Sequence, residues 1–298
     1  MSEIVKFIGV GAVKSGSSWM ASILEQHSEV SMSSRKEIAY FNTFNFNGTK
    51  NNSTGYGLDY YLKFWSKMKG VKGEVSPQYL FDFSAPKKIK NAFPDVQILM
   101  ILRNPNDVLY SHFLYEQGFN QNIESQLSFI EALDKYPYLI ESARFSTQVK
   151  RYIEVFSPTN LHIYFLDKAL KDPQAFSKRL YSDIGLNDVE FIPDYASVNE
   201  SKQVGSKLAN AIIRFPSLIK QRLESSVFGL LVNRLKASKL FIHIVKFRNG
   251  LLDQNIRPLI KPKLTEGEVK YISRLLKDEI VELENLLDLD LSRWKTCD

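Results

Sequence analysis

Short apolar runs rich in β-branched residues alternate along the chain with segments of helical periodicity. The mostly apolar runs, which predict buried strands, are Ile4–Val10, Val71–Val75, Gln97–Leu102 and Leu161–Phe165, with a shorter one near Val30–Met32. Helical patterns cover Ser17–Gln26, Leu58–Met68, Pro105–Tyr115, Phe145–Phe156, Gln174–Ile184 and Glu266–Leu287. Strands that alternate with helices indicate a central parallel sheet flanked by helices, an α/β fold. Because no Pro/Gly-rich linker divides residues 1–298, we expect a single domain.

Composition places the chain among ordinary globular proteins. Hydrophobic residues make up 44% of its 298 residues and charged residues 24%. The only cysteine is Cys297, which excludes a disulfide framework and fits a reducing compartment. No run reaches the roughly 18 apolar residues of a membrane span, and the start lacks the features of a signal peptide. We therefore expect a cytoplasmic protein.

A glycine-rich segment follows the first predicted strand and opens the first predicted helix. Its residues are Lys14, Ser15, Gly16, Ser17, Ser18 and Trp19. Such a turn directs free backbone N–H groups and the positive helix end at an anion. Gly11 and Gly16 have the spacing of a nucleotide P-loop, but Ser17 stands where that loop has its lysine, and the lysine lies inside the turn at position 14. The segment predicts a phosphate-binding loop.

A second candidate anion site follows the third long strand. Arg103 ends this strand, Pro105 occupies a favoured helix-start position, and Ser111 lies two turns into the helix. An arginine can grip a phosphate bidentately and a serine can donate a hydroxyl to it. A magnesium-dependent nucleotide kinase would typically have a metal-holding aspartate at such a strand end. The two loops therefore predict phosphate binding without a metal.

Together these residues resemble the sulfotransferases that use 3′-phosphoadenosine 5′-phosphosulfate (PAPS). Lys14 to Trp19 looks like the 5′-phosphosulfate loop of that family, and Arg103-Asn104-Pro105 with Ser111 looks like its 3′-phosphate motif. Two further segments are similar to the bacterial and heparan-type branch: Lys36-Glu37-Ile38-Ala39-Tyr40-Phe41, and Gly73-Glu74-Val75-Ser76-Pro77-Gln78-Tyr79. Val75 and Ala39 stand where heparan-type members usually have a basic residue and a histidine, which argues against a standard heparan acceptor.

The resemblance implies a P-loop-like sheet and metal-independent, in-line transfer of a sulfuryl group from PAPS to an acceptor hydroxyl or amine, with PAP as the product. Lys14 would neutralise the leaving oxygen. The cofactor-binding residues implied are Lys14, Ser15, Gly16, Ser17, Ser18, Trp19, Arg103, Ser111 and, from a looser match, Lys202. The acceptor is left open as a small molecule, a lipid or a saccharide. Nucleic acid is not expected as a partner.

Two carboxylates compete for the role of general base. Glu37 matches the family's glutamate by position in the Lys-Glu-x-x-x-Phe pattern, and we favour it. Its alternative is a surface pair with Lys36 or Arg35. Glu74 ends a predicted strand and is the second candidate. The alternative for Glu74 is a structural role, as the partner of Ser76 or of a backbone amide.

Positive charge concentrates in residues 202–263, which carry 13 Lys and Arg against two acidic residues. We interpret this basic segment as a lid over a doubly phosphorylated cofactor. The alternative is a peripheral membrane- or polyanion-binding module on a degenerate nucleotide fold. A magnesium-dependent phosphotransferase is the remaining enzymatic alternative.

Overall fold

The computed structural model describes residues 5–44, 51, 53–65, 69–120, 122–196, 202–204, 256–258 and 262–295. The chain divides into two compact units. The first comprises Met1–Phe113, Gln126–Asn199 and Lys263–Asp298, and the second comprises Leu114–Ser125 and Glu200–Pro262. The expectation of a single domain stays a prediction.

The first unit is built on one parallel sheet in the order β2-β3-β1-β4-β5. Its strands are β1 (Phe7–Gly11), β2 (Val30–Met32), β3 (Val71–Val75), β4 (Gln97–Leu102) and β5 (Leu161–Phe165). All four pairings are parallel, which confirms the predicted α/β fold. β1 lies at the centre and is buried throughout, because helices cover both faces of the sheet. It starts at Phe7, later than the apolar pattern indicated.

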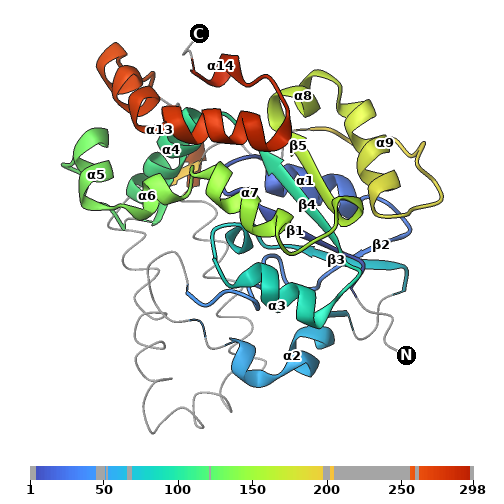
Figure 1. Ribbon diagram of the computed structural model, residues 1–298. Helices are drawn as coiled ribbons and strands as arrows, with labels where there is room; N and C mark the ends of the chain where they lie inside the picture. Colours follow the sequence, from blue (N-terminus) through green and yellow to red (C-terminus); the bar gives the residue numbers. More distant parts are fainter. Residues whose placement is uncertain are drawn as a thin grey trace, which may run out of the picture. The chain divides into compact units, whose positions relative to one another are not determined.

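Helices connect the strands and pack on the two faces. In chain order they are α1 (Ser17–Glu25), α2 (Leu58–Leu62), α3 (Ala85–Ala92), α4 (Pro105–Tyr115), α5 (Phe129–Lys135), α6 (Tyr138–Glu141), α7 (Phe145–Ile153), α8 (Leu166–Lys171), α9 (Pro173–Asp183), α13 (Glu266–Leu287) and α14 (Ser292–Lys295). Figure 1 shows α3 and α7 in front of the sheet and α1 behind it. α4 and α13 have the predicted bounds, whereas the pattern at Leu58–Met68 gives α2 followed by a 3₁₀ turn, Lys63–Trp65, before residues that are not described.

The core behind the sheet joins α1 and α9 to the strands. Met20 and Ile23 of α1 and Leu180 of α9 pack against Phe7 of β1 and Leu99 of β4, all fully buried. Burial of each large side chain contributes roughly 1.5–3 kcal/mol, so this cluster supplies much of the free energy that holds α1 against the sheet. The N-terminus of α1 is thereby fixed at the edge of the sheet.

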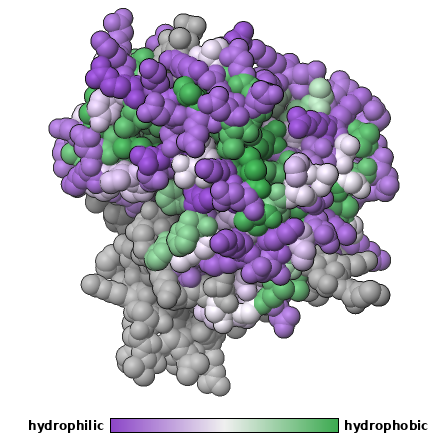
Figure 2. Space-filling view, in the orientation of Figure 1, coloured by the Kyte–Doolittle hydropathy of each residue, from purple (hydrophilic) through white to green (hydrophobic). Residues whose placement is uncertain are grey.

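One face of the described chain is mainly polar, with an apolar area near its centre (Figure 2). The apolar area lies about where Figure 1 draws β4 and β5. The helix α13 is amphipathic. Its buried residues recur at three- and four-residue steps: Ile272, Leu276, Ile280 and Leu283. Within the described residues, no helix combines the length and apolar character that crossing a membrane requires.

Candidate active site

Three of the predicted site residues, Lys14, Glu37 and Arg103, lie in loops at one edge of the sheet. Carboxyl ends of parallel strands share an edge, and ligands of such sheets bind there. Lys14 follows β1, Glu37 follows β2 and Arg103 follows β4. The loop after β1 is joined to the end of β4, since the Ala12 amide donates to the carbonyl of Ile101 in β4 over 2.8 Å.

The loop after β1 is shaped for close approach of an anion. Lys14 has φ 57° and Gly16 has φ 92°, and such turns cluster backbone N–H groups around a concavity. In α1, Met20 donates to the Gly16 carbonyl over 3.0 Å, so the amides of Ser17 and Ser18 precede the helical hydrogen-bond ladder. A Cβ at Gly16 would come within 2.7 Å of Leu166 Cδ1. The positive φ and the nearby Leu166 side chain both favour glycine at this position.

Two of the expected cofactor-binding side chains face inward. Ser15 is fully buried, and its hydroxyl donates to the Val13 carbonyl over 3.3 Å. The Trp19 ring stacks on Phe176 with centroids 5.2 Å apart, and its Nε1 donates to the Tyr195 carbonyl over 3.4 Å. Any contact of Trp19 with an anion therefore falls to its backbone amide, the third of the helix.

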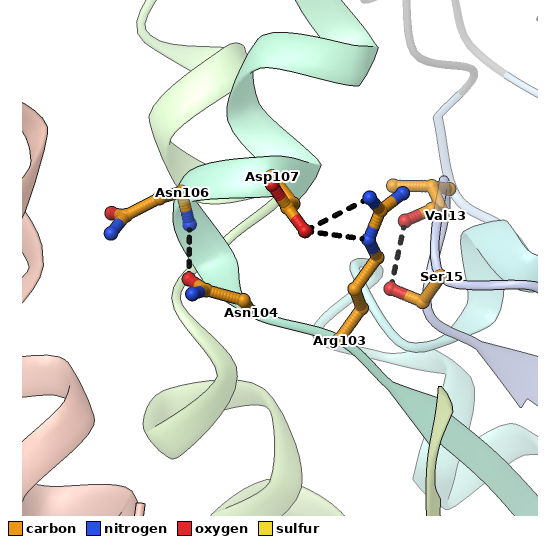
Figure 3. A network of polar contacts seen from close by, with 6 residues as sticks. All are labelled: Val13, Ser15, Arg103, Asn104, Asn106 and Asp107. Carbon is orange, nitrogen blue, oxygen red and sulfur yellow. Dashed lines mark hydrogen bonds and ion pairs between the residues drawn. The ribbon is translucent and has the colours of Figure 1, made fainter. Parts of the chain in front are cut away.

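The loop after β4 presents Arg103. Asn104 caps α4 by accepting from the Asn106 amide over 3.0 Å, and Pro105 is the first helical residue. Arg103 Nε and Nη2 both contact Asp107 Oδ2, at 3.0 and 2.9 Å, and the arginine side chain is 29% exposed. Figure 3 shows this pair together with the loop that contains Val13 and Ser15. The serine expected to assist, Ser111, is buried as the seventh residue of α4.

Glu37 is half-buried and has φ 55°. Burial raises the pKa of its carboxyl, and the charges of Lys36 and Lys14 oppose that rise. Lys14 therefore lies near enough to Glu37 to act on its ionisation. Glu37 is therefore not a freely solvated carboxylate, although the charge of Lys36, its partner in the alternative of a surface pair, acts on it more strongly than that of Lys14.

Glu74 is fully buried and saturated with hydrogen bonds. It accepts from Ser76, the Ile38 amide and the hydroxyls of Tyr61 and Tyr79. Burial raises the pKa of Glu74, while these four bonds lower it. Its partners include Ser76 and a backbone amide, as the structural alternative stated. Tyr79 ends the family-like segment that begins at Gly73, but the sequence did not indicate that the two tyrosines donate to Glu74.

The remaining predicted residues belong to the second unit. Lys202 is the first residue of β6 (Lys202–Val204), which pairs antiparallel with β7 (Ile256–Pro258). Most of the basic segment 202–263 lies outside the described residues. Among the residues that are described, no group of three or more His, Cys, Asp or Glu could hold a metal ion.

Comparison with known proteins gives consistent results. A family profile described as "Sulfotransferase domain" matches residues 6–213. The human bifunctional heparan sulfate N-deacetylase/N-sulfotransferase 3 is 22% identical over 204 residues, covering 62% of this chain and 22% of that protein. A membrane-associated sulfotransferase of Dictyostelium discoideum, kil1, is 25% identical over 104 residues, covering 33% of this chain and 20% of that protein. The chain thus spans about a fifth of the length of these curated relatives.

The fold has a counterpart among solved structures. The crystal structure of a sulfotransferase from Alicyclobacillus acidocaldarius superposes with a TM-score of 0.68 at 19% identity, covering 99% of this chain and 100% of that one. The family resemblance carried by the two loops is confirmed. Since the profile spans more than half of the chain and includes both Lys14 and Arg103, the chain belongs to the sulfotransferase family.

Proposed function

We propose that this protein transfers a sulfuryl group from PAPS to an acceptor hydroxyl or amine, without a metal ion. The observation that carries the proposal is that two loops suited to anions, one with Lys14 and one with Arg103, follow the neighbouring parallel strands β1 and β4. A nucleotide phosphorylated at both ends of its ribose has two anionic groups for these loops. The curated relatives, whose names include sulfotransferase activity, support the same reaction.

The donor set fits a 3′,5′-bisphosphorylated nucleotide. In this proposal the amides of Ser17 and Ser18 and the start of α1 hold the 5′ end, and Lys14 contacts the bond that breaks. In this proposal Arg103 and Ser111 hold the 3′-phosphate, while Lys202, which belongs to the second unit, stays a prediction. Two nitrogens of Arg103 already contact one carboxylate oxygen, and the same guanidinium can bind a phosphate bidentately.

When bound, PAPS supplies an activated sulfuryl group, and the chain's own residues do the rest. The acceptor oxygen or nitrogen forms a bond to sulfur as the sulfur–oxygen bond to the 5′-phosphate breaks. Lys14 neutralises the charge that develops on the leaving oxygen. Glu37 takes the acceptor proton, a role that its raised pKa and nearness to Lys14 suit. Glu74 has no lone pair to spare for an acceptor.

The acceptor class follows less directly. The relatives named as heparan sulfate N-sulfotransferases favour a saccharide amine or hydroxyl. Val75 and Ala39 lack the charges that usually accompany a heparan acceptor, so we propose a less anionic saccharide ahead of a lipid or a small metabolite. A cytoplasmic location stays a prediction.

The test is transfer of isotopically labelled sulfate from PAPS to acceptors in a cell extract, with chelator present and products identified by mass spectrometry. The proposal expects a labelled sulfated product that forms equally well without magnesium. Phosphorylated product from ATP, formed only with magnesium, would instead identify a phosphotransferase. Binding to anionic vesicles without any transfer would favour the membrane-binding alternative for the basic segment.

A further inference from the structure

The loop that contains Glu37 is held by side chains from the end of the neighbouring strand β3 and from the turn after it. Three consecutive backbone amides of the loop each donate to one of these side chains. The donors Ile38, Ala39 and Tyr40 bind Glu74 Oε2 at 3.3 Å, Ser76 Oγ at 3.0 Å and Tyr79 Oη at 2.9 Å, in that order. The loop backbone is therefore fixed residue by residue immediately after Glu37.

Glu74 organises the two hydroxyls of this arrangement. Ser76 donates its proton to Glu74 Oε2 over 2.6 Å, and Tyr79 donates to Oε1 over 2.8 Å. With their protons committed to the carboxylate, both hydroxyl oxygens are left to accept from the loop amides. Tyr61 also donates to Oε1, over 2.7 Å, but bonds to none of these three amides. All four side chains are buried, so water does not compete.

The held segment has a backbone that would not persist unaided. Glu37 and Ala39 have φ of 55° and 54°, in the left-handed region that residues with a Cβ rarely adopt. Such conformations last only where surrounding structure over-determines them. Here that restraint comes from the three hydrogen bonds donated by the loop amides and from the buried side chains of Ile38 and Tyr40. The same restraint on the backbone sets the direction in which the Glu37 side chain points.

We infer that Glu74, with Ser76 and Tyr79, is a positioning residue for sulfate transfer: it holds the Glu37 loop so that the Glu37 carboxylate meets the acceptor beside Lys14. This inference rests on the proposed function, in which Glu37 is the base. Glu74 acts through the loop backbone and does not contact the acceptor. Misplacement of a catalytic group by about 1 Å can cost on the order of 10²-fold in rate, so the restraint matters to turnover.

The decisive comparison is Tyr79→Phe against Tyr61→Phe. Each substitution keeps the buried ring and removes one hydroxyl that donates to Glu74 Oε1. Only Tyr79→Phe also removes the acceptor of a loop amide. We expect Tyr79→Phe to lower kcat for sulfate transfer by about 10- to 10²-fold, and Tyr61→Phe to stay within about twofold of the wild type, with PAP affinity unchanged in both. Equal kcat values for the two variants at similar melting temperatures would overturn the inference.

A pH profile distinguishes positioning from general loss of structure. Release of the loop hydrates Glu37, so its raised pKa falls and the acid limb of kcat moves to lower pH in Tyr79→Phe. An unmoved limb contradicts the inference. Ser76→Ala, which removes the acceptor of the Ala39 amide, provides a second variant with the same expected shift if Tyr79→Phe fails to fold.

A double-variant cycle links the effect to Glu37. In a Glu37→Gln background, Tyr79→Phe should cause no further loss of transfer, because the group being positioned is already gone. Additive losses would overturn the positioning role while leaving the sulfotransferase proposal intact. If Glu37→Gln alone retains full activity, then both the base and its positioning are wrong. No transfer from PAPS by the wild type would instead reject the proposed function itself.

Discussion

Asp107 holds the guanidinium of Arg103 at two nitrogens, Nε at 3.0 Å and Nη2 at 2.9 Å. The residues are one helical turn apart, and the Asp107 side chain is 52% exposed. The arginine assigned to the 3′-phosphate therefore already has an anionic partner. Such exposed pairs contribute only about 0.2–1 kcal/mol, so a phosphate can replace the carboxylate at small cost.

Asp107→Asn should strengthen binding of PAP. The substitution removes a carboxylate that competes for Arg103 and repels the phosphate, so we expect a gain of about 1.5- to 5-fold in affinity at low salt, shrinking as salt rises. Titration calorimetry at two ionic strengths measures it. Weaker binding in the variant would show that Asp107 orients Arg103 for the phosphate and does not compete with it.

Arg103→Ala should affect one end of the nucleotide selectively. Because the proposed contact is with the 3′-phosphate, the loss of affinity should be about tenfold or more for PAP, the scale of a charge-assisted bidentate bond, and small for adenosine 5′-monophosphate. Competition binding with the two ligands provides the comparison. A similar loss for both would place Arg103 elsewhere than at the 3′-phosphate.

Gly16→Ala should damage the phosphate loop. Its φ of 92° disfavours any residue with a Cβ by about 1–2 kcal/mol, and the added methyl would meet Leu166. Gly185→Ala is the matched control, since Gly185 has φ 75° but a Cβ there meets nothing within 4 Å. We expect both variants to lose stability in urea unfolding, with a larger loss for Gly16→Ala. Only Gly16→Ala should lose PAP binding, and intact binding in that variant contradicts the role of the loop.

Protonation of Glu37 should make kcat fall at low pH, and this fall is the acid limb of the pH profile. A base works deprotonated and burial raises the pKa of this carboxyl, so kcat should begin to fall at a higher pH than an ordinary glutamate would cause. Glu37→Gln should remove the limb and lower transfer by about 10²–10⁴-fold. The raised pKa also means that the ionised group opposes folding. The melting temperature of Glu37→Gln should therefore exceed that of the wild type near neutral pH and approach it in acid. A limb that persists in Glu37→Gln belongs to another group.

The strands were predictable because their chemistry is local. Gln97–Leu102 is a strongly apolar run, and β4 has those bounds. The glycine-rich turn was likewise predictable, because the spacing of its glycines is a local feature of the sequence. Short helices such as α5 and α8 have too few turns for a reliable period, and the pattern did not predict them.

The site was predictable only in part. Asp107 could have been found from its four-residue spacing to Arg103 on a predicted helix. The bond from Tyr61 to Glu74 could not, because Tyr61 reaches the carboxylate across packed tertiary structure and resembles any core tyrosine in sequence. Trp19 shows the same limit, since its position in the loop motif does not reveal that its ring packs on Phe176.

The central claim is that the loop containing Lys14 is the centre of sulfuryl transfer. Its most direct test is single-turnover transfer of labelled sulfate from PAPS, in chelator, by the wild type and by Lys14→Met, which keeps the side-chain length and removes the charge. Because Lys14 acts on charge that develops only in the transition state, the rate should fall at least about 10²-fold while PAP affinity changes far less. Transfer by Lys14→Met at close to the wild-type rate would contradict the account.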